Sequence, residues 1–227
     1  MGPLIEIKDL TSSSDDGRKI FEGASLALSG GEKVLVTAPV SAGKSLLLKL
    51  IAGLVRPEGG VVRVFGEDIA NLSGDGLKSI RKRMGFVFQD TTLISNLKVI
   101  ENVALPMQYH TEISYASSME RARLLLEEAG FTGDLWALPG PLPLFAKKEV
   151  AAARALSLEP EIILCENITD GLTEFEKERV ASFILGYHAS GGKLLILTSN
   201  TGDEETFFRP GRMVRIEGRR LVERNAD

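Results

Sequence analysis

The sequence has a single cysteine and lacks an excess of positive charge. Its 227 residues include one cysteine and carry a formal net charge of -4. A lone cysteine cannot form a disulfide within the chain, so Cys165 favours a reducing compartment, and its place in an apolar run suggests a core position. A nucleic-acid partner would require a basic surface to neutralise phosphates, and the composition gives no reason to expect one.

Long hydrophobic runs are also missing. The most apolar stretch, Leu46 to Val55, is interrupted by Lys49 and has about half of the roughly 20 residues that a membrane span needs. The N-terminus reaches Glu6 before any long apolar run, so we expect no signal peptide. These absences predict a cytoplasmic protein whose attachment to a membrane would come from a partner.

The remaining composition is that of a folded domain. Hydrophobic residues make up 44% of the chain and charged residues 26%, which excludes a largely disordered protein. A length of 227 residues is at the upper end for one compact α/β domain. We therefore expect a single domain over residues 1–227, with room for an inserted lobe.

The pattern of apolar residues changes along the chain. Short antiparallel strands are predicted at 4–7, 17–21 and 24–28, followed by a buried strand at 33–37 and a helix at 44–54. Further strands are predicted at 61–65, 83–89, 161–165 and 193–198. A short helix ends at 79–82, a longer helix is predicted at 174–187, and a hairpin is predicted at 213–222. Between them, residues 96–156 are mainly helical, with breaks at Pro139, Pro141 and Pro143.

This order predicts an α/β fold with a parallel core sheet, an N-terminal antiparallel β-subdomain and an inserted helical subdomain. The core would comprise residues of about 1–90 and 157–227, and the helical subdomain residues of about 91–156.

The loop between the buried strand and its helix has the pattern of a P-loop, with alanine in place of the first glycine. Its residues are Ala38, Pro39, Val40, Ser41, Ala42, Gly43, Lys44 and Ser45, and Leu46 follows them. Backbone N–H groups at a helix start favour an anion, Lys44 can reach phosphates, and the Ser45 hydroxyl can ligate Mg²⁺. If position 38 needs a left-handed backbone, Ala38 costs roughly 1–2 kcal/mol. The alternative is an ordinary helix start that happens to contain a lysine.

Three further segments follow in a characteristic order. Gly85 to Asp90 looks like the Q-loop, Val150 to Leu156 matches the helix after the signature motif, and Glu159 to Leu164 matches the approach to a Walker B strand. With the P-loop, they make the chain resemble the ABC ATPase family of P-loop NTPases from about Ile5 to Val222. The segment Leu97–Met107 looks most like the Mla-type lipid-transport branch.

The resemblance implies ATP and Mg²⁺ as cofactors. It implies that Ser45, Gln89 and Glu166 lie at the metal, with Gln89 coupling that site to the helical lobe. It also implies two kinds of partner, a membrane permease and a second ATPase chain in a homodimer or heterodimer, and a location on the inner face of the cell membrane. The transported substrate and the direction of transport are not readable, because the permease selects the substrate.

Several positions depart from the family pattern. Asn167 stands at the position of the catalytic base, and Glu166 replaces the Walker B aspartate. An amide cannot accept a proton from water at neutral pH, and loss of a general base typically costs about 10²- to 10⁴-fold in rate. Ser199 replaces the switch histidine, and Thr173 the D-loop aspartate.

Two loops differ as well. Leu142 to Ala146 replaces a signature loop that is rich in serine and glycine and that reaches the partner's ATP across a dimer in the family. Pro143 has no N–H, and Leu144 and Phe145 add bulk there. The aromatic residue that stacks on adenine has no counterpart in Ser12 to Ser14.

Two hypotheses follow. The first is the ATP-binding subunit of an ABC transporter, with lipids as the candidate substrate, impaired hydrolysis and weak or absent ATP-driven dimerisation. The second is a non-catalytic scaffold or regulatory subunit that does not need nucleotide.

Overall fold

The computed structural model describes residues 2–224, which form two β-sheets with helices around them. The four-stranded sheet has the order β2-β1-β4-β5 and consists of β1 (Ile5–Ser13), β2 (Lys19–Leu28), β4 (Gly59–Val64) and β5 (Glu67–Asp68). All of its strand pairs are antiparallel. The expected antiparallel N-terminal sheet is therefore present.

One expectation for this sheet was wrong. The sequence suggested separate strands at 17–21 and 24–28, whereas β2 runs without interruption through Gly23. Gly23 has φ 67, and the pairing with β1 shifts register between Leu10 and Ser12, so the chain bulges here instead of turning. β1 also continues beyond the expected end at Ile7.

The six-stranded sheet has the order β10-β9-β3-β8-β7-β6. Its strands are β3 (Lys33–Thr37), β6 (Met84–Val87), β7 (Ile162–Glu166), β8 (Leu194–Ser199), β9 (Arg212–Glu217) and β10 (Arg220–Arg224). All neighbours are parallel except the β9–β10 hairpin. The fold class expected from the sequence is confirmed, including the mainly parallel core sheet.

The parallel strands bury both faces, as their continuous apolar sequences require. In β3, Val34 and Val36 belong to a core with α1 (Lys44–Ile51) and the antiparallel sheet. Leu35, between them, belongs to a second core with α5 (Leu144–Leu156), α6 (Glu174–Ala189) and α7 (Asp203–Phe208). The period-2 alternation of a strand thus divides the apolar side chains between two layers.

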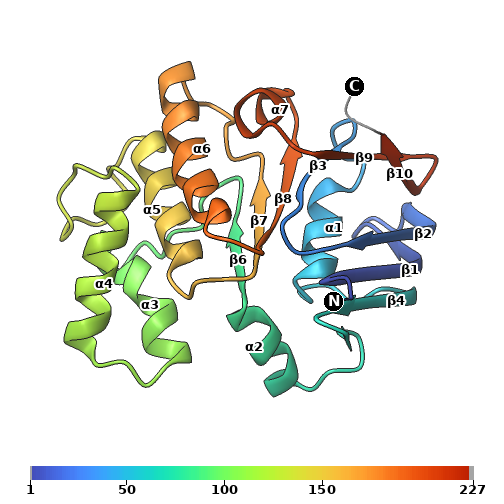
Figure 1. Ribbon diagram of the computed structural model, residues 1–227, viewed down its shortest axis with the longest axis horizontal. Helices are drawn as coiled ribbons and strands as arrows, with labels where there is room; N and C mark the ends of the chain where they lie inside the picture. Colours follow the sequence, from blue (N-terminus) through green and yellow to red (C-terminus); the bar gives the residue numbers. More distant parts are fainter. Residues whose placement is uncertain (1, 225–227) are drawn as a thin grey trace.

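The remaining helices are α2 (Gly74–Lys82), α3 (Val99–His110) and α4 (Tyr115–Glu128). A third apolar cluster joins α3, α4 and α5. Figure 1 shows these three helices on one side of the parallel strands, and β1, β2 and β4 on the opposite side. Within residues 2–224, no helix combines the length and apolar character that a membrane crossing requires.

Candidate functional site

The P-loop connects β3 to α1 through residues 38–43. Its left-handed residues are Ser41, with φ 62, and Gly43, with φ 104, whereas Ala38 is not among the described residues with positive φ. Ala38 therefore does not carry the free-energy cost of a left-handed backbone. Ser41 carries it instead, at about 1 kcal/mol. A Cβ on Gly43 would lie 2.2 Å from Ile20 Cγ2, so this position accommodates glycine only.

Lys44 is folded back over the loop. Its Nζ donates to the carbonyl oxygens of Ala38, at 2.7 Å, and Pro39, at 3.2 Å. The side chain is 5% exposed, and burial lowers the pKa of the ammonium group, against the opposite influence of Asp170 and Glu204. The lysine therefore holds a positive charge at the start of α1 with only neutral carbonyls as hydrogen-bond acceptors.

A cavity of about 440 Å³, which we call the P-loop cavity, opens over this loop. Its lining residues are Ser14, Asp15, Arg18, Ile20, Val40, Ser41, Gly43, Lys44, Ser45, Leu46, Lys49, Val55, Gln89, Asn167 and Asn200. Gln89, Asn167 and Asn200 follow the ends of β6, β7 and β8, so the cavity lies at the carboxyl edge of the parallel strands. Ligands of open α/β sheets bind at this edge, and the volume is within the usual range of ligand sites.

Among the residues that the structure describes, no aromatic side chain lines the P-loop cavity. Ser14 reaches it, as expected for the segment that lacks an adenine-stacking residue, and Ile20 and Val55 supply apolar wall. Arg18 was not singled out from the sequence, but its Nη2 donates to the Ser41 carbonyl at 2.7 Å. A guanidinium therefore belongs to the wall of the cavity and is hydrogen-bonded to the P-loop.

Amide side chains bridge the strand ends beside the cavity. Asn167 Nδ2 donates to Gln89 Oε1 at 2.9 Å, and Gln89 Nε2 donates to Asp170 Oδ2 at 3.4 Å. Asn200 Nδ2 donates to the same Asp170 oxygen at 3.2 Å. Asn167 Oδ1 and Asp170 Oδ1 are buried without a hydrogen-bond partner among the described residues. Asn167 and Gln89, predicted separately from the sequence, are thus in direct contact.

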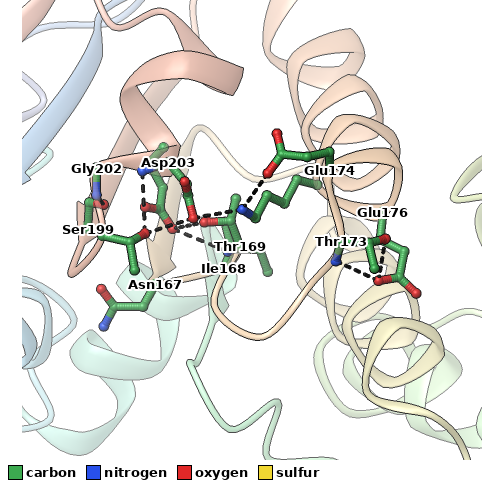
Figure 2. A network of polar contacts seen from close by, with 12 residues as sticks. Asn167, Ile168, Thr169, Thr173, Glu174, Glu176, Ser199, Gly202 and Asp203 are labelled. Carbon is green, nitrogen blue, oxygen red and sulfur yellow. Dashed lines mark hydrogen bonds and ion pairs between the residues drawn. The ribbon is translucent and has the colours of Figure 1, made fainter.

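Ser199, predicted at the switch position, does not line the P-loop cavity but a neighbouring one, together with Ala38 and Pro39. It is 4% exposed, and its Oγ accepts the backbone N–H of Gly202 at 2.7 Å, so the hydroxyl closes the turn before α7. Figure 2 shows Ser199 and Gly202 together in this turn. The neighbouring Asn200, and not Ser199, lines the P-loop cavity.

Two buried charges hold the loop after β7. Lys148 of α5 is 1% exposed, and its Nζ donates to the carbonyls of Ile168, at 2.6 Å, and Asn167, at 3.2 Å. From the other side, Glu204 of α7 accepts hydrogen bonds from the Thr169 N–H and hydroxyl, at 3.2 and 2.7 Å. Figure 2 shows this loop in its network of polar contacts. Neither residue was identified from the sequence, because burial of a charged side chain cannot be recognised without the fold.

The loop after Gln89 is also fastened to α5. Arg154 donates to the carbonyls of Thr91, at 2.8 Å, and Thr92, at 2.9 Å, both of which have positive φ. The segment Leu142 to Ala146, whose last three residues form the first turn of α5, does not reach the P-loop cavity of the same chain. α5 therefore supports the loops that carry Gln89 and Asn167.

Two residues that line the P-loop cavity with Lys44 offer oxygen donors that suit Mg²⁺, the Ser45 hydroxyl and the Gln89 amide oxygen. The third predicted ligand, Glu166, is buried at the end of β7 beside Asn167 and does not itself line the cavity. No group of three acidic, histidine or cysteine side chains among residues 2–224 could hold a metal by itself. Mg²⁺ is usually held by few protein ligands together with substrate phosphates and water, so this donor set fits the ion when nucleotide is present.

Comparison with known proteins gives consistent matches. Residues 21–170 match the ABC transporter family. A probable ribonucleotide transport ATP-binding protein of Mycobacterium leprae is 33% identical over 91% of this chain and 59% of the relative. An intermembrane phospholipid transport system ATP-binding protein of Haemophilus influenzae is 35% identical over 71% of this chain and 61% of the relative. The chain thus spans about three-fifths of the length of these relatives.

Solved structures agree. A bacterial ABC transporter cassette, described as dimeric, has a TM-score of 0.89 and 27% identity, over 97% of this chain and 98% of the cassette. An ATP-binding cassette in a post-hydrolysis state, described as dimeric and bound to ADP and phosphate, has a TM-score of 0.88 and 26% identity.

Proposed function

Because the chain belongs to the ABC transporter family, we propose that it binds ATP with Mg²⁺ in the P-loop cavity and is the nucleotide-binding subunit of a transporter. The observation that carries this proposal is the position of Lys44. The ammonium group is buried at the start of a helix, beside the cavity, and makes hydrogen bonds only to neutral carbonyls. A phosphate oxygen is a charged acceptor and forms a stronger hydrogen bond with this group.

The division of roles in the site follows from its side chains. Lys44 and the N–H groups at the start of α1 bind phosphate, and Ser45, Gln89 and Glu166 are the candidate metal ligands. Mg²⁺, when bound, neutralises phosphate charge. Asn167 can orient a water molecule through its amide but cannot remove a proton from it, so hydrolysis is slow.

The test is calorimetric titration with ATP in the presence of Mg²⁺. Loss of a charged hydrogen bond worth about 1.5–3 kcal/mol predicts that Lys44→Ala weakens binding roughly 10- to 150-fold. Lys82→Ala, on the exposed part of α2 and outside the P-loop cavity, is the control and leaves the affinity unchanged. Equal affinities for the two variants would refute the role given to Lys44.

A second function, a scaffold that needs no nucleotide, is favoured by one observation, the absence of aromatic side chains from the cavity. No measurable binding of ATP by the unaltered chain at millimolar concentration would support the scaffold. Binding in the micromolar range would exclude it.

For the assembly, we propose a membrane permease and a second ATPase chain, identical or different, as partners, with the chain held at the inner face of the membrane. Similarity to a phospholipid transport protein supports a lipid substrate, although a methionine import protein is also among the relatives. Co-purification of the tagged chain from membranes, followed by identification of the permease, tests this assembly. Recovery of the chain without any membrane protein would contradict it.

A further inference from the structure

Asp170 lies behind the wall of the P-loop cavity and contacts two residues that form that wall. Its Oδ2 accepts hydrogen bonds from Gln89 Nε2, at 3.4 Å, and from Asn200 Nδ2, at 3.2 Å. Asp170 itself does not line the cavity. Its carboxylate is close enough to Lys44 to raise the pKa of that ammonium group against the effect of burial. The negative charge therefore acts on the phosphate-binding side of the site.

A carboxylate decides which way an amide side chain faces. The two ends of a Gln or Asn amide differ only in being donor or acceptor, and their neighbours determine the orientation. The carboxylate of Asp170 can only accept, so the NH₂ groups of Gln89 and Asn200 turn toward it. The oxygen of Gln89 then turns away, toward Asn167 Nδ2 at 2.9 Å. With a neutral residue at position 170, either orientation of Gln89 could be satisfied.

We propose that Asp170 is a positioning residue for the metal–nucleotide site: it holds Gln89 with its amide oxygen presented to Mg²⁺ and so strengthens the Mg²⁺-dependent part of ATP binding. This inference rests on the proposed function. The side-chain Nδ2 of Asn167 donates a hydrogen bond to the Gln89 amide oxygen when no metal is bound. Ligation by Gln89 then exchanges one neutral hydrogen bond for a bond to the ion, without reorienting the amide.

The experiment compares ATP affinity in Mg²⁺ with ATP affinity in EDTA, by calorimetry, for the unaltered chain and Asp170→Asn. Loss of one hydrogen bond to a charged group predicts that the factor by which Mg²⁺ strengthens ATP binding is at least about fivefold smaller in the variant. The affinity in EDTA does not fall, because no phosphate contact is removed and one negative charge near the phosphates is neutralised. Asp90→Asn is the matched control, since Asp90 is exposed and adjacent to Gln89, and it retains the full effect of Mg²⁺.

A double-mutant cycle separates positioning from a purely structural role. In a Gln89→Met background, Asp170→Asn has no further effect on the factor by which Mg²⁺ strengthens ATP binding. Mn²⁺ binding in the presence of ATP, followed by electron paramagnetic resonance, shows the same pattern. If Asp170→Asn does not fold, Asp170→Ser replaces it in the cycle.

The outcomes are distinct. Unchanged strengthening by Mg²⁺ in a folded Asp170→Asn variant, with at most a lower melting temperature, overturns this inference and leaves the proposed function intact. Failure of the unaltered chain to bind ATP in either buffer overturns both.

Discussion

Asn167 has the backbone conformation that asparagine tolerates better than most residues. Its φ is 43, in the left-handed region, and its N–H donates to the Thr198 carbonyl at 3.2 Å. Asparagine and aspartate are several-fold enriched at such angles. At the residue scale, the amide therefore suits the bend after β7, although it removes the basic group that hydrolysis uses in the family.

The consequence for hydrolysis can be measured. Asn167→Gly keeps a residue that adopts positive φ and removes the amide, and since no base is lost, turnover changes by less than about threefold, against about 10²- to 10⁴-fold for loss of a true base. Phosphate release from ATP by the purified variants gives the rates. A hundredfold loss in Asn167→Gly would show that the residue takes part in proton transfer. A rate in the unaltered chain that matches an intact family member and is abolished by Lys44→Ala would contradict slow hydrolysis.

Part of the site was predictable at this scale. Most of the predicted P-loop positions line one cavity with Gln89 and Asn167, because strand–loop–helix order and the parallel sheet bring strand ends together; Ala38, Pro39 and Ala42 do not line it. Asp170, Lys148 and Glu204 were not identified, because their importance comes from contacts between elements distant in the sequence. Pattern alone does not reveal which charged residue is buried.

At the scale of elements, the strongest periodic signals were the most informative. The hairpin at 213–222 corresponds to β9 and β10, with positive φ at both turn residues, Gly218 and Arg219, as a two-residue type I′ turn requires. Helix α1 ends at Ile51 and not at Leu54, because the chain turns through Gly53 with φ 65. α7 was not predicted, since six residues are too few for a helical periodicity to be recognised.

The packing of β6 on α5 supports the strand that leads to Gln89. A Cβ at Gly85 would lie 2.4 Å from the Ala155 carbonyl oxygen and 3.0 Å from Pro160 Cγ. Gly85→Ala is therefore expected to lower the free energy of unfolding by about 1–3 kcal/mol, the usual cost of overpacking. Urea unfolding monitored by circular dichroism measures this change.

A second glycine provides the matched control. Gly186 is within α6, and a Cβ there would meet no atom within 4 Å. Gly186→Ala should raise the free energy of unfolding by up to about 1 kcal/mol through helix propensity. If Gly85→Ala and Gly186→Ala changed the free energy of unfolding in the same direction, the close approach of β6 to α5 would not explain the effect at Gly85.

At the scale of the whole molecule, the binding surfaces for phosphate and for a partner chain differ in character. The P-loop cavity contains Lys44, Lys49 and Arg18, whereas the segment at the start of α5 has an exposed Pro143 and a Leu144 that is 43% exposed. In the family, this segment binds the partner's ATP with serine and backbone N–H groups. In a dimer of the proposed kind, one chain would present its bound nucleotide to a segment of the other chain that has neither the serine nor the glycine of the family.

We therefore predict that ATP and Mg²⁺ do not drive stable dimerisation of the unaltered chain. In a dimer of the family type, Leu144 would place an apolar side chain against charged phosphate oxygens, and Pro143 would lack the N–H that a phosphate needs. Gel filtration with light scattering should give the monomer mass with and without nucleotide.

The double variant Pro143→Ser, Leu144→Gly restores a hydroxyl and a close backbone approach, and it leaves Phe145 in the core with α6. An ATP-dependent increase in mass for this variant alone would place the defect in the signature loop. A stable ATP-dependent dimer of the unaltered chain would contradict the prediction, because apolar residues would then have to form the contact that serine and glycine make in the family.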